Sequence, residues 1–394
     1  MNLNGINQAQ PSVMPKSKLL VQPQEQQTTQ TEAAGAEKKP SDSGCLKNYF
    51  LGSVSFGGRP CSTSNFAIKK LKDVPCCCCG KPMLRETDLQ ECKSAVANSR
   101  GEKLAAVVDE YGKYMRADEK CVATILANKA KETGCDVSQA MKQTGSKVRE
   151  LTGQYASGIL TELNAMATEA FKSEDNPMAA VIAKAQEQIA KGGGLDRSTF
   201  VEQLGKAAGK LPEDLQGAIQ DKAMDLPQTF NHVQRIYDKY QNRSADDIAR
   251  RLFSTALTTA EHIHPHSLGG PDNTANYIAE CAGCNNPRGN MSYSEWLKIH
   301  PEFPLKAQDH IEWFQQQVVD GKIDSRYDDY GVDVKATLSK ESNGIIELKV
   351  LNPEKIQQLR EAKKANQEAD VTTEIANQEN QEEEQPQKMR SRYR

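Results

Sequence analysis

Two pairs of cysteines with the same internal spacing, placed far apart in the chain, constrain the fold more than any other feature of this sequence. Cys76 and Cys79 form the first pair, with Gly80 directly after it, and Cys281 and Cys284 form the second. A structural zinc ion takes four soft ligands in a tetrahedron, usually as two pairs that each sit on one tight turn. The spacing therefore predicts that two distant parts of the chain meet at one structural Zn²⁺.

The first pair is part of an unbroken run of four cysteines, and we interpret Cys77 and Cys78 as spacers. Two alternatives stay open: the cysteines are ordinary buried thiols, or the run is lipidated. Lipidation needs a membrane-adjacent surface, which the neighbours Asp73 and Lys81 do not supply. The chain has eleven cysteines, an odd number that fits poorly with a disulfide framework. We therefore expect a reducing compartment with some thiols on a metal.

Both ends of the chain have the composition of unfolded segments. Residues 1–44 form a polar leader without an aromatic residue, and residues 352–394 form a charged tail rich in Gln and Glu. With a hydrophobic content of 37%, we expect both to be largely disordered or marginally helical. The sequence shows no signal peptide and no apolar run that could span a membrane, so we expect a cytoplasmic protein without a membrane partner. No acidic residue precedes Glu25, as in the leaders of some exported bacterial effectors, and delivery to another cell's cytosol is the alternative.

Between the cysteine pairs the sequence has a helical pattern. Apolar residues such as Val148, Ile159 and Leu163 recur at three- and four-residue steps and share one helix face. Asn176 followed by Pro177 predicts a helix start. We expect residues 84–248 to form a helical insertion, a bundle by its size, with apolar stripes that serve as core and carry no catalytic group.

The segment after the second cysteine pair predicts further helices and a hairpin. Ser292 and Glu295 have the spacing of a capping box, and a second helix is expected from about Leu305 to Asp320. Val332 to Leu338 and Ile345 to Val350 flank Asn343-Gly344, a pattern typical of a β-hairpin. Residues 301–351 are therefore expected to form a helix plus a β-hairpin.

The stretch that leads into the second cysteine pair is dense in groups that can do chemistry. Its notable residues are Glu261, His262, Gly269, Gly270, Asn276, Asn285 and Arg288. Cleaving a phosphodiester bond needs a base to deprotonate water and a cation to carry charge at the leaving oxygen. The order of an acid-His pair, a middle Asn, Cys-x-x-Cys-Asn and a trailing basic residue resembles the HNH endonuclease motif, also called the ββα-metal fold.

The resemblance implies a role for each of these residues. His262 would polarise the attacking water, and Asn276 would fix its orientation through the backbone around it. Glu261 and Asn285 would be ligands of a catalytic divalent cation, and Mg²⁺ suits such oxygen ligands. Arg288 would contact a nucleic-acid phosphate. The four cysteines would hold the structural zinc, with a Cys-x-x-Cys-Gly before the acid-His strand, as in zinc-bearing members of the family.

The chain departs from the family pattern in three ways. The acid is Glu261 where Asp is commoner. The helical region makes the two cysteine pairs much further apart than is usual, although loop-closure entropy grows only logarithmically with length. His264 and His266 crowd the motif, and their roles stay open as ligand, second base or bystander.

Charge gives mixed evidence about nucleic acid as a partner. The chain has a formal net charge of −3, and residues 255–300 hold more acidic than basic side chains, which counts against strong non-specific DNA binding. Residues 56–83, by contrast, carry Arg59 and several lysines against Asp73 alone. If that basic stretch folds beside the motif, the phosphate contacts would come from there.

These observations predict an α+β protein. Residues 45–83 and 249–300 would form the two halves of a zinc-stabilised, treble-clef-like ββα-metal core around the helical insertion. The implied function is metal-dependent hydrolysis of phosphodiester bonds in nucleic acid, with DNA preferred. The alternative is a non-catalytic, zinc-scaffolded binding or effector protein whose helical insertion contacts a protein partner. The local acidic charge and Glu261 favour the alternative, whereas His262, Asn276 and Asn285 favour the enzyme.

Overall fold

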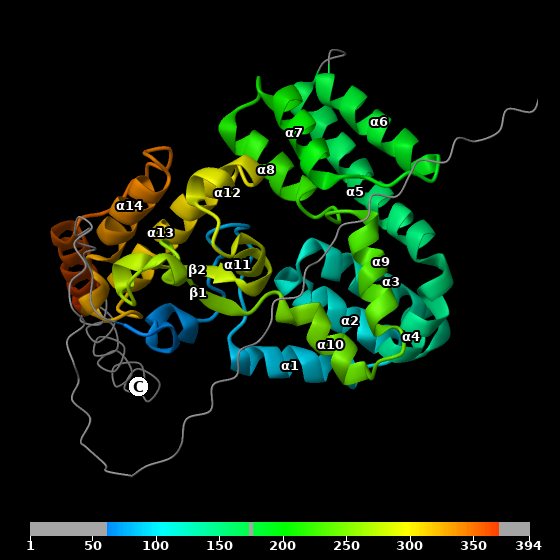
Figure 1. Cartoon of the computed structure of the whole chain (residues 1–394), viewed down its shortest axis with the longest axis horizontal. Helices are drawn as coiled ribbons and strands as arrows, with labels where there is room; N and C mark the ends of the chain where they lie inside the picture. Colours follow the sequence, from blue (N-terminus) through cyan, green and yellow to red (C-terminus); the bar gives the residue numbers. More distant parts are fainter. Residues whose placement is uncertain (1–60, 173–175, 370–394) are drawn as a thin grey trace, which may run out of the picture. The chain divides into compact units, whose positions relative to one another are not determined.

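Helices dominate the described part of the chain, which comprises residues 61–172 and 176–369 of a computed structural model (Figure 1). All of these residues fall within one compact unit, Val54–Arg394. The helices before the sheet are α1 (Glu86–Ala97), α2 (Gly101–Tyr111), α3 (Ala117–Thr133), α4 (Val137–Thr144), α5 (Val148–Phe171), α6 (Pro177–Ala190), α7 (Arg197–Ala208), α8 (Glu213–Ala223), α9 (Phe230–Tyr240) and α10 (Ala245–Ser254). Those after the first strand are α11 (Ala282–Arg288), α12 (Tyr293–Ile299), α13 (Phe303–Val319) and α14 (Tyr330–Glu341).

The single sheet among the described residues has two antiparallel strands, β1 (Thr258–His262) and β2 (Tyr277–Cys281). Thr258 pairs with Cys281 at one end of the ladder, and His262 pairs with Tyr277 at the other. Short 3₁₀ turns flank these elements: η1 (Thr63–Asn65), η2 (Ala67–Lys70), η3 (Gly112–Tyr114), η4 (Gly145–Lys147), η5 (His266–Leu268), η6 (Thr274–Asn276) and η7 (Ser325–Tyr327). The α+β prediction is confirmed at this level, as a mostly helical chain with a small antiparallel sheet.

Local sequence signals explain where several helices begin. The Asn176 side chain accepts hydrogen bonds from the first backbone amides of α6, which has Pro177 at its first position. Ser292 and Glu295 form a complete capping box on α12. Both starts were predicted from sequence, and both satisfy amides that the helix itself leaves unpaired.

The helical region contains two separate hydrophobic cores. One lies among α1 to α4, α9 and α10, and includes Leu126 and Phe253. The other lies among α5 to α8 and includes Leu160 and Phe200. The long helix α5 begins in the first core with Val148 and continues into the second, so it connects the two.

A third core surrounds the sheet, and we call it the strand core. It joins residues 61–83 to β1, β2, α12, α13, α14 and the segment up to Ile356. The backbone N–H of Cys77 donates to Ala279 O of β2 at 3.1 Å, and the Phe66 ring lies 5.6 Å from that of Tyr277. The basic stretch, as far as it is described, therefore does fold beside the motif (blue segment next to the strands, Figure 1).

The predicted β-hairpin after α13 is wrong. Residues Tyr330–Glu341 form α14, whose buried Tyr330, Val334 and Leu338 recur every four residues. Asn343 and Gly344, interpreted as a hairpin turn, instead follow the helix end in left-handed conformation. The extended segment beyond them bonds to side chains of α13 and not to a strand, since Gln308 and Gln315 contact the backbone of residues 349 and 351.

The charged tail is only partly as expected. Residues 353–369 are helical, with Ile356 fully buried and Arg360 in an ion pair with Asp328 at 2.6 Å. This segment of the tail is therefore helical and packs on the strand core. The predicted disorder of residues 1–44 and of the tail from residue 370 lies outside the described residues.

Candidate metal centre and adjacent histidine loop

The four predicted zinc ligands meet in space. The sulfur atoms of Cys76, Cys79, Cys281 and Cys284 all lie within 4.8 Å of one another. Four sulfurs at the usual zinc distance of roughly 2.3 Å would lie about 3.8 Å apart, so the cluster is compact enough to close around one ion. Among residues 61–172 and 176–369 it is the one group of metal-ligating side chains with this geometry. The cluster fits a structural metal such as zinc, with no ligand position left for substrate.

Two tight turns present the sulfurs. In the first, Gly80 N donates to Cys76 O at 2.8 Å and Cys76 N donates to Lys81 O at 2.9 Å. Gly80 has a φ of +69°, a conformation that favours glycine. In the second, β2 ends at Cys281 and α11 starts at once, which brings Cys284 into the first helical turn. The backbone N–H of Cys281 donates to Cys76 Sγ at 3.3 Å, so the two turns are in direct contact.

Two of the four sulfur atoms in the cluster favour the deprotonated form. Hydrogen bonds from the other three thiols, that of Cys281 foremost, hold the pKa of Cys79 well below its usual range. Burial alone would raise the pKa of Cys281, but hydrogen bonds from the cluster and the charge of Arg116 lower it. Cys77 lies outside the group, because its Sγ is 3.5 Å from Glu280 Oε1 and burial raises its pKa well above the usual range. Metal ligands must be thiolates. Burial raises the pKa of Cys76, and hydrogen bonds with the neighbouring thiols raise the pKa of Cys284, so position in the cluster, and not the direction of the pKa shift, distinguishes the four cysteines from Cys77.

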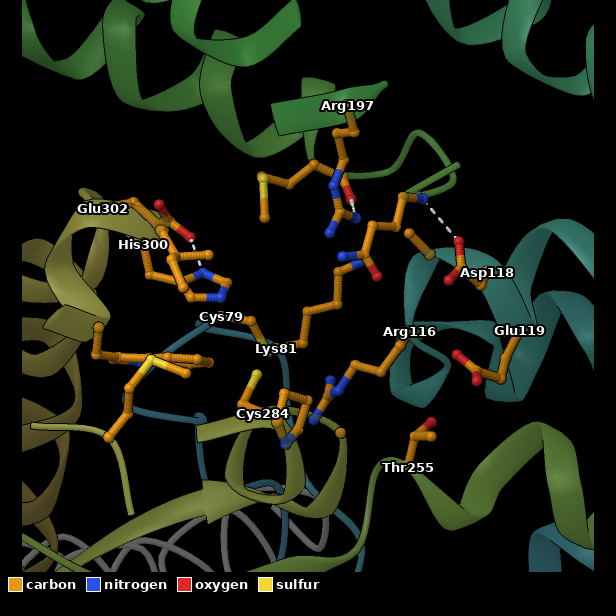
Figure 2. Close-up of a pocket in the computed structure, with 18 residues that line it drawn as sticks. Cys79, Lys81, Arg116, Asp118, Glu119, Arg197, Thr255, Cys284, His300 and Glu302 are labelled. Atoms are coloured by element: carbon orange, nitrogen blue, oxygen red, sulfur yellow. Dashed lines mark hydrogen bonds and ion pairs between the residues drawn. The ribbon is translucent and has the colours of Figure 1, made fainter. Parts of the chain in front are cut away.

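An arginine from the helical region touches the cluster. Arg116 stands directly before α3, and its Nε donates to Cys281 Sγ at 3.1 Å. Its two terminal nitrogens are buried without a hydrogen-bond partner among the described residues. Figure 2 shows the side chain extending from α3 toward Cys284. Burial alone would lower the pKa of the guanidinium, but the four sulfur atoms outweigh it and raise the pKa well above its usual range. The helical region therefore supplies a fixed positive charge to the metal centre, which the sequence did not indicate.

A cavity of about 370 Å³ opens beside the cluster. Its lining includes Cys79, Cys284, Arg116, Trp296 and His300, and Figure 2 shows Arg116 and His300 on different sides of the cysteines. The His300 ring stacks on Trp296 at 4.1 Å and bonds to Glu302. Cations, carboxylates and apolar side chains are mixed in the lining, so its composition selects no particular ligand.

Glu261 and Arg288 form a buried ion pair. The Glu261 side chain is 9% exposed and that of Arg288 is 0% exposed, and the carboxylate accepts from Arg288 Nη2. Arg288 also donates to Met291 O at 2.7 Å and to His262 O. Burial raises the pKa of Glu261, and Arg288 opposes that effect. This placement contradicts the expectation that Arg288 contacts a phosphate, because its guanidinium faces the protein interior. Arg288 also occupies the carboxylate of Glu261, which the resemblance assigned to a catalytic cation.

His262 lies on the face of β1 opposite Glu261. It bonds to Asp272, an acid that is not part of the resemblance. Its Nε2 lies 2.9 Å from Asp272 Oδ1, and the Tyr277 hydroxyl donates to the same oxygen at 2.8 Å. These hydrogen bonds, that from His262 first, lower the pKa of Asp272. Because an ionised carboxylate only accepts hydrogen bonds, Nε2 carries the proton, and Nδ1 is the free acceptor of the neutral ring. The side chains of His262 and Asp272 are 18% and 54% exposed, so solvent reaches the pair.

Asn276 fixes the loop that follows His262, residues 263–276, which we call the histidine loop. Its Oδ1 accepts from His264 N at 2.8 Å, and its Nδ2 donates to His264 O and Pro271 O, both at 3.0 Å. A side chain on Gly270 would place Cβ 1.9 Å from His264 O, so only glycine fits this turn. The His264 ring bonds to Glu341 and to Leu268 O, whereas the exposed His266 ring lies 5.4 Å from that of His262.

Asn285 does not complete an open cation site with Glu261. Its Nδ2 donates to Thr259 Oγ1 at 2.8 Å, while Glu261 is paired with Arg288. The oxygen ligands that the resemblance assigned to Mg²⁺ therefore do not converge as a free pair. The exposed carboxylate that bonds to His262 is that of Asp272.

Comparison of the chain with protein-family models, with curated proteins and with solved structures gave no match. In the part of the chain that the structure describes, no helix has the length and apolarity needed to cross a membrane.

Proposed function

We propose that this protein is an endonuclease of the HNH type that hydrolyses phosphodiester bonds in nucleic acid, with DNA preferred. The observation that carries the proposal is the His262–Asp272 pair at the end of β1, 2.9 Å from nitrogen to oxygen and open to solvent. The strand, turn, strand and helix from Thr258 to Arg288 provide the frame. The four-cysteine cluster at the far end of the ladder, holding a structural zinc, would keep that frame closed.

The chemistry assigned to His262 follows from its tautomer. Asp272 accepts a hydrogen bond from His262 Nε2. This bond holds the ring in one orientation and leaves Nδ1 to accept a proton from water. Tyr277 donates to the same carboxylate oxygen and keeps it in place. Asn276 holds the backbone two residues further on. A divalent cation would stabilise charge on the phosphate, and the Glu261–Arg288 pair does not offer it an open ligand.

A binding protein without catalysis is the second candidate, and the same ion pair favours it. A Glu261 neutralised by Arg288 suits a structural role in the strand core. The 370 Å³ cavity between the metal cluster and the helical region would then be the functional site. In that case the His262–Asp272 pair would be a surface hydrogen bond only.

Supercoiled-plasmid nicking by the full-length, zinc-loaded protein separates the two candidates. We expect nicking that depends on added Mg²⁺. His262→Ala should lower it by about 10²–10⁴-fold, the usual contribution of a general base. His232→Ala, on α9 in the helical region, is the matched control and should cleave like the parent. In a parallel assay, EDTA should abolish nicking. The zinc content must be measured there as well, because EDTA can also remove the metal from the cysteine cluster.

The proposal fails if the zinc-loaded parent leaves every nucleic acid intact. It also fails if His262→Ala cleaves as fast as the parent.

A further inference from the structure

A polar cavity adjoins the acid that holds His262. It has a volume of about 750 Å³, and its lining includes Asp272, Lys70 and Arg326 together with the polar side chains of Ser62, Asn65 and Thr274. The basic stretch forms one wall through η1 and η2, and η7 forms another. Cys61 N donates to Asp272 O at 3.0 Å, and Ala67 N donates to the Tyr327 hydroxyl at 3.3 Å. The walls are therefore tied to the histidine loop and to each other.

The two cations in this cavity are held more loosely than others in the strand core. Lys70 is exposed, and no carboxylate of the described residues lies within ion-pair distance of it. Arg326 is 60% exposed, its Nε is 3.8 Å from Asp324, and its guanidinium lies over the Tyr327 ring at 5.6 Å. Lys81, by contrast, is paired with Asp225 at 2.7 Å. Lys70 and Arg326 can therefore meet an incoming anion with little loss of existing contacts.

We propose that this cavity binds a backbone phosphate of the nucleic acid next to the one attacked at His262, with Lys70 and Arg326 as its two cationic contacts. This inference rests on the proposed function. Asp272 joins the two places, because it lines the cavity and also bonds to His262 Nε2. A strand that places one phosphate at His262 would place the next phosphate of the same strand near the cavity that Asp272 lines.

Charge supports the assignment. Phosphate contacts by Lys and Arg provide most of the affinity for nucleic acid, yet the motif itself is more acidic than basic. Arg288 is buried and unable to contribute. The cations must come from other segments, and Lys70 and Arg326 are the ones that line a cavity at the histidine loop.

The test is the salt dependence of binding to a fluorescent DNA duplex by the full-length, zinc-loaded protein without Mg²⁺. Each lost phosphate contact should lower the slope of log affinity against log salt by about 1. Because both side chains contact the same phosphate, the double variant Lys70→Gln/Arg326→Gln should lose about 1 from the slope and bind all sequences more weakly. Lys72→Gln/Lys335→Gln is the matched control, since both lysines are exposed and neither lines the cavity. Zinc content and far-UV circular dichroism should be unchanged in both double variants.

The outcomes separate this inference from the proposed function. A parent that nicks plasmid and a Lys70→Gln/Arg326→Gln variant with the parent's slope and affinity would overturn the phosphate site and leave the nuclease standing. A parent that neither binds nor cleaves nucleic acid would overturn both. At matched ionic strength, an excess of inorganic phosphate over chloride should leave the duplex bound, and displacement of the duplex by phosphate alone would show that the cavity takes free phosphate instead of a strand.

Discussion

His310 shows how a single residue connects α13 to the metal-binding turn. Its side chain is fully buried, and its Nδ1 donates to Pro75 O, one residue before the first zinc ligand, at 2.8 Å. Its Nε2 is buried without a partner among the described residues. Burial lowers the pKa of His310 from 6.5 to about 4. The ring is therefore neutral in the folded protein at neutral pH, and it must gain a proton when the chain unfolds in mild acid.

This shift predicts a pH-dependent loss of stability. The folded pKa lies below the unfolded value, so the stability contribution is complete above pH 6.5 and is lost as the pH falls toward 4. Between pH 7 and 5 the loss should be roughly 2 kcal/mol, measured as the free energy of unfolding in urea. His310→Asn keeps an N–H donor for Pro75 O but does not titrate, so its stability should fall less over the same range. Zinc release in acid is common to both proteins and cancels in the comparison. An equal fall in both would contradict the assignment.

At the scale of elements, the start of α3 forms part of the metal centre. Zinc with four thiolates carries a net charge of about −2, and the buried Arg116 guanidinium lies against Cys281 Sγ. Groups that contact metal ligands typically contribute 10–100-fold to metal affinity. Arg116→Met should therefore weaken zinc binding by about that factor, measured by competition with a chromophoric chelator, and Arg116→Lys should restore part of it.

Arg197, which lines the same cavity as Arg116, is the control for this prediction. Arg197 donates to Met224 O and Leu226 O and not to sulfur, so Arg197→Met should hold zinc like the parent. Parent-like affinity in Arg116→Met would mean that the contact with Cys281 contributes nothing to metal binding.

Helix starts and buried helix faces that depend on nearby residues were predictable from the sequence. Asn176 and Ser292 cap helices where their spacing indicated, and the stripe that includes Val148 and Leu163 is the buried face of α5. The hairpin prediction failed because Asn-Gly supplies left-handed residues to a helix end as readily as to a turn. The four-residue spacing of Tyr330, Val334 and Leu338 was the signal that should have decided it.

The cysteine cluster was predictable because the spacing within each cysteine pair is enough to identify it. The four cysteines of the cluster follow from two Cys-x-x-Cys turns. Contacts between distant side chains were not predictable: Arg116 reaches Cys281 across 165 positions of sequence. Asp272 could have been noticed as the acid in the loop between His262 and its ladder partner Tyr277. The burial of Arg288 depends on packing that no local pattern records.

In the whole molecule, the two cysteine turns lie on either side of the helical region in sequence and meet in one cluster. Cys281 N lies 3.3 Å from Cys76 Sγ although 205 positions separate the two residues. Metal-binding energy at such a site is also folding energy, because an ion bound by the four cysteines would hold residues 61–83 against β2 and α11. The histidine loop is built on the other end of the same ladder, so its geometry depends on this closure.

The most direct test is the zinc content of the full-length protein purified under reducing conditions, measured by native mass spectrometry. The account predicts about one zinc ion per chain, as four ligands in one tetrahedron require. Cys281→Ser should lose that zinc, whereas Cys77→Ser, a neighbouring buried thiol outside the cluster, should keep it. A parent without zinc, or equal loss from Cys77→Ser and Cys281→Ser, would contradict the account.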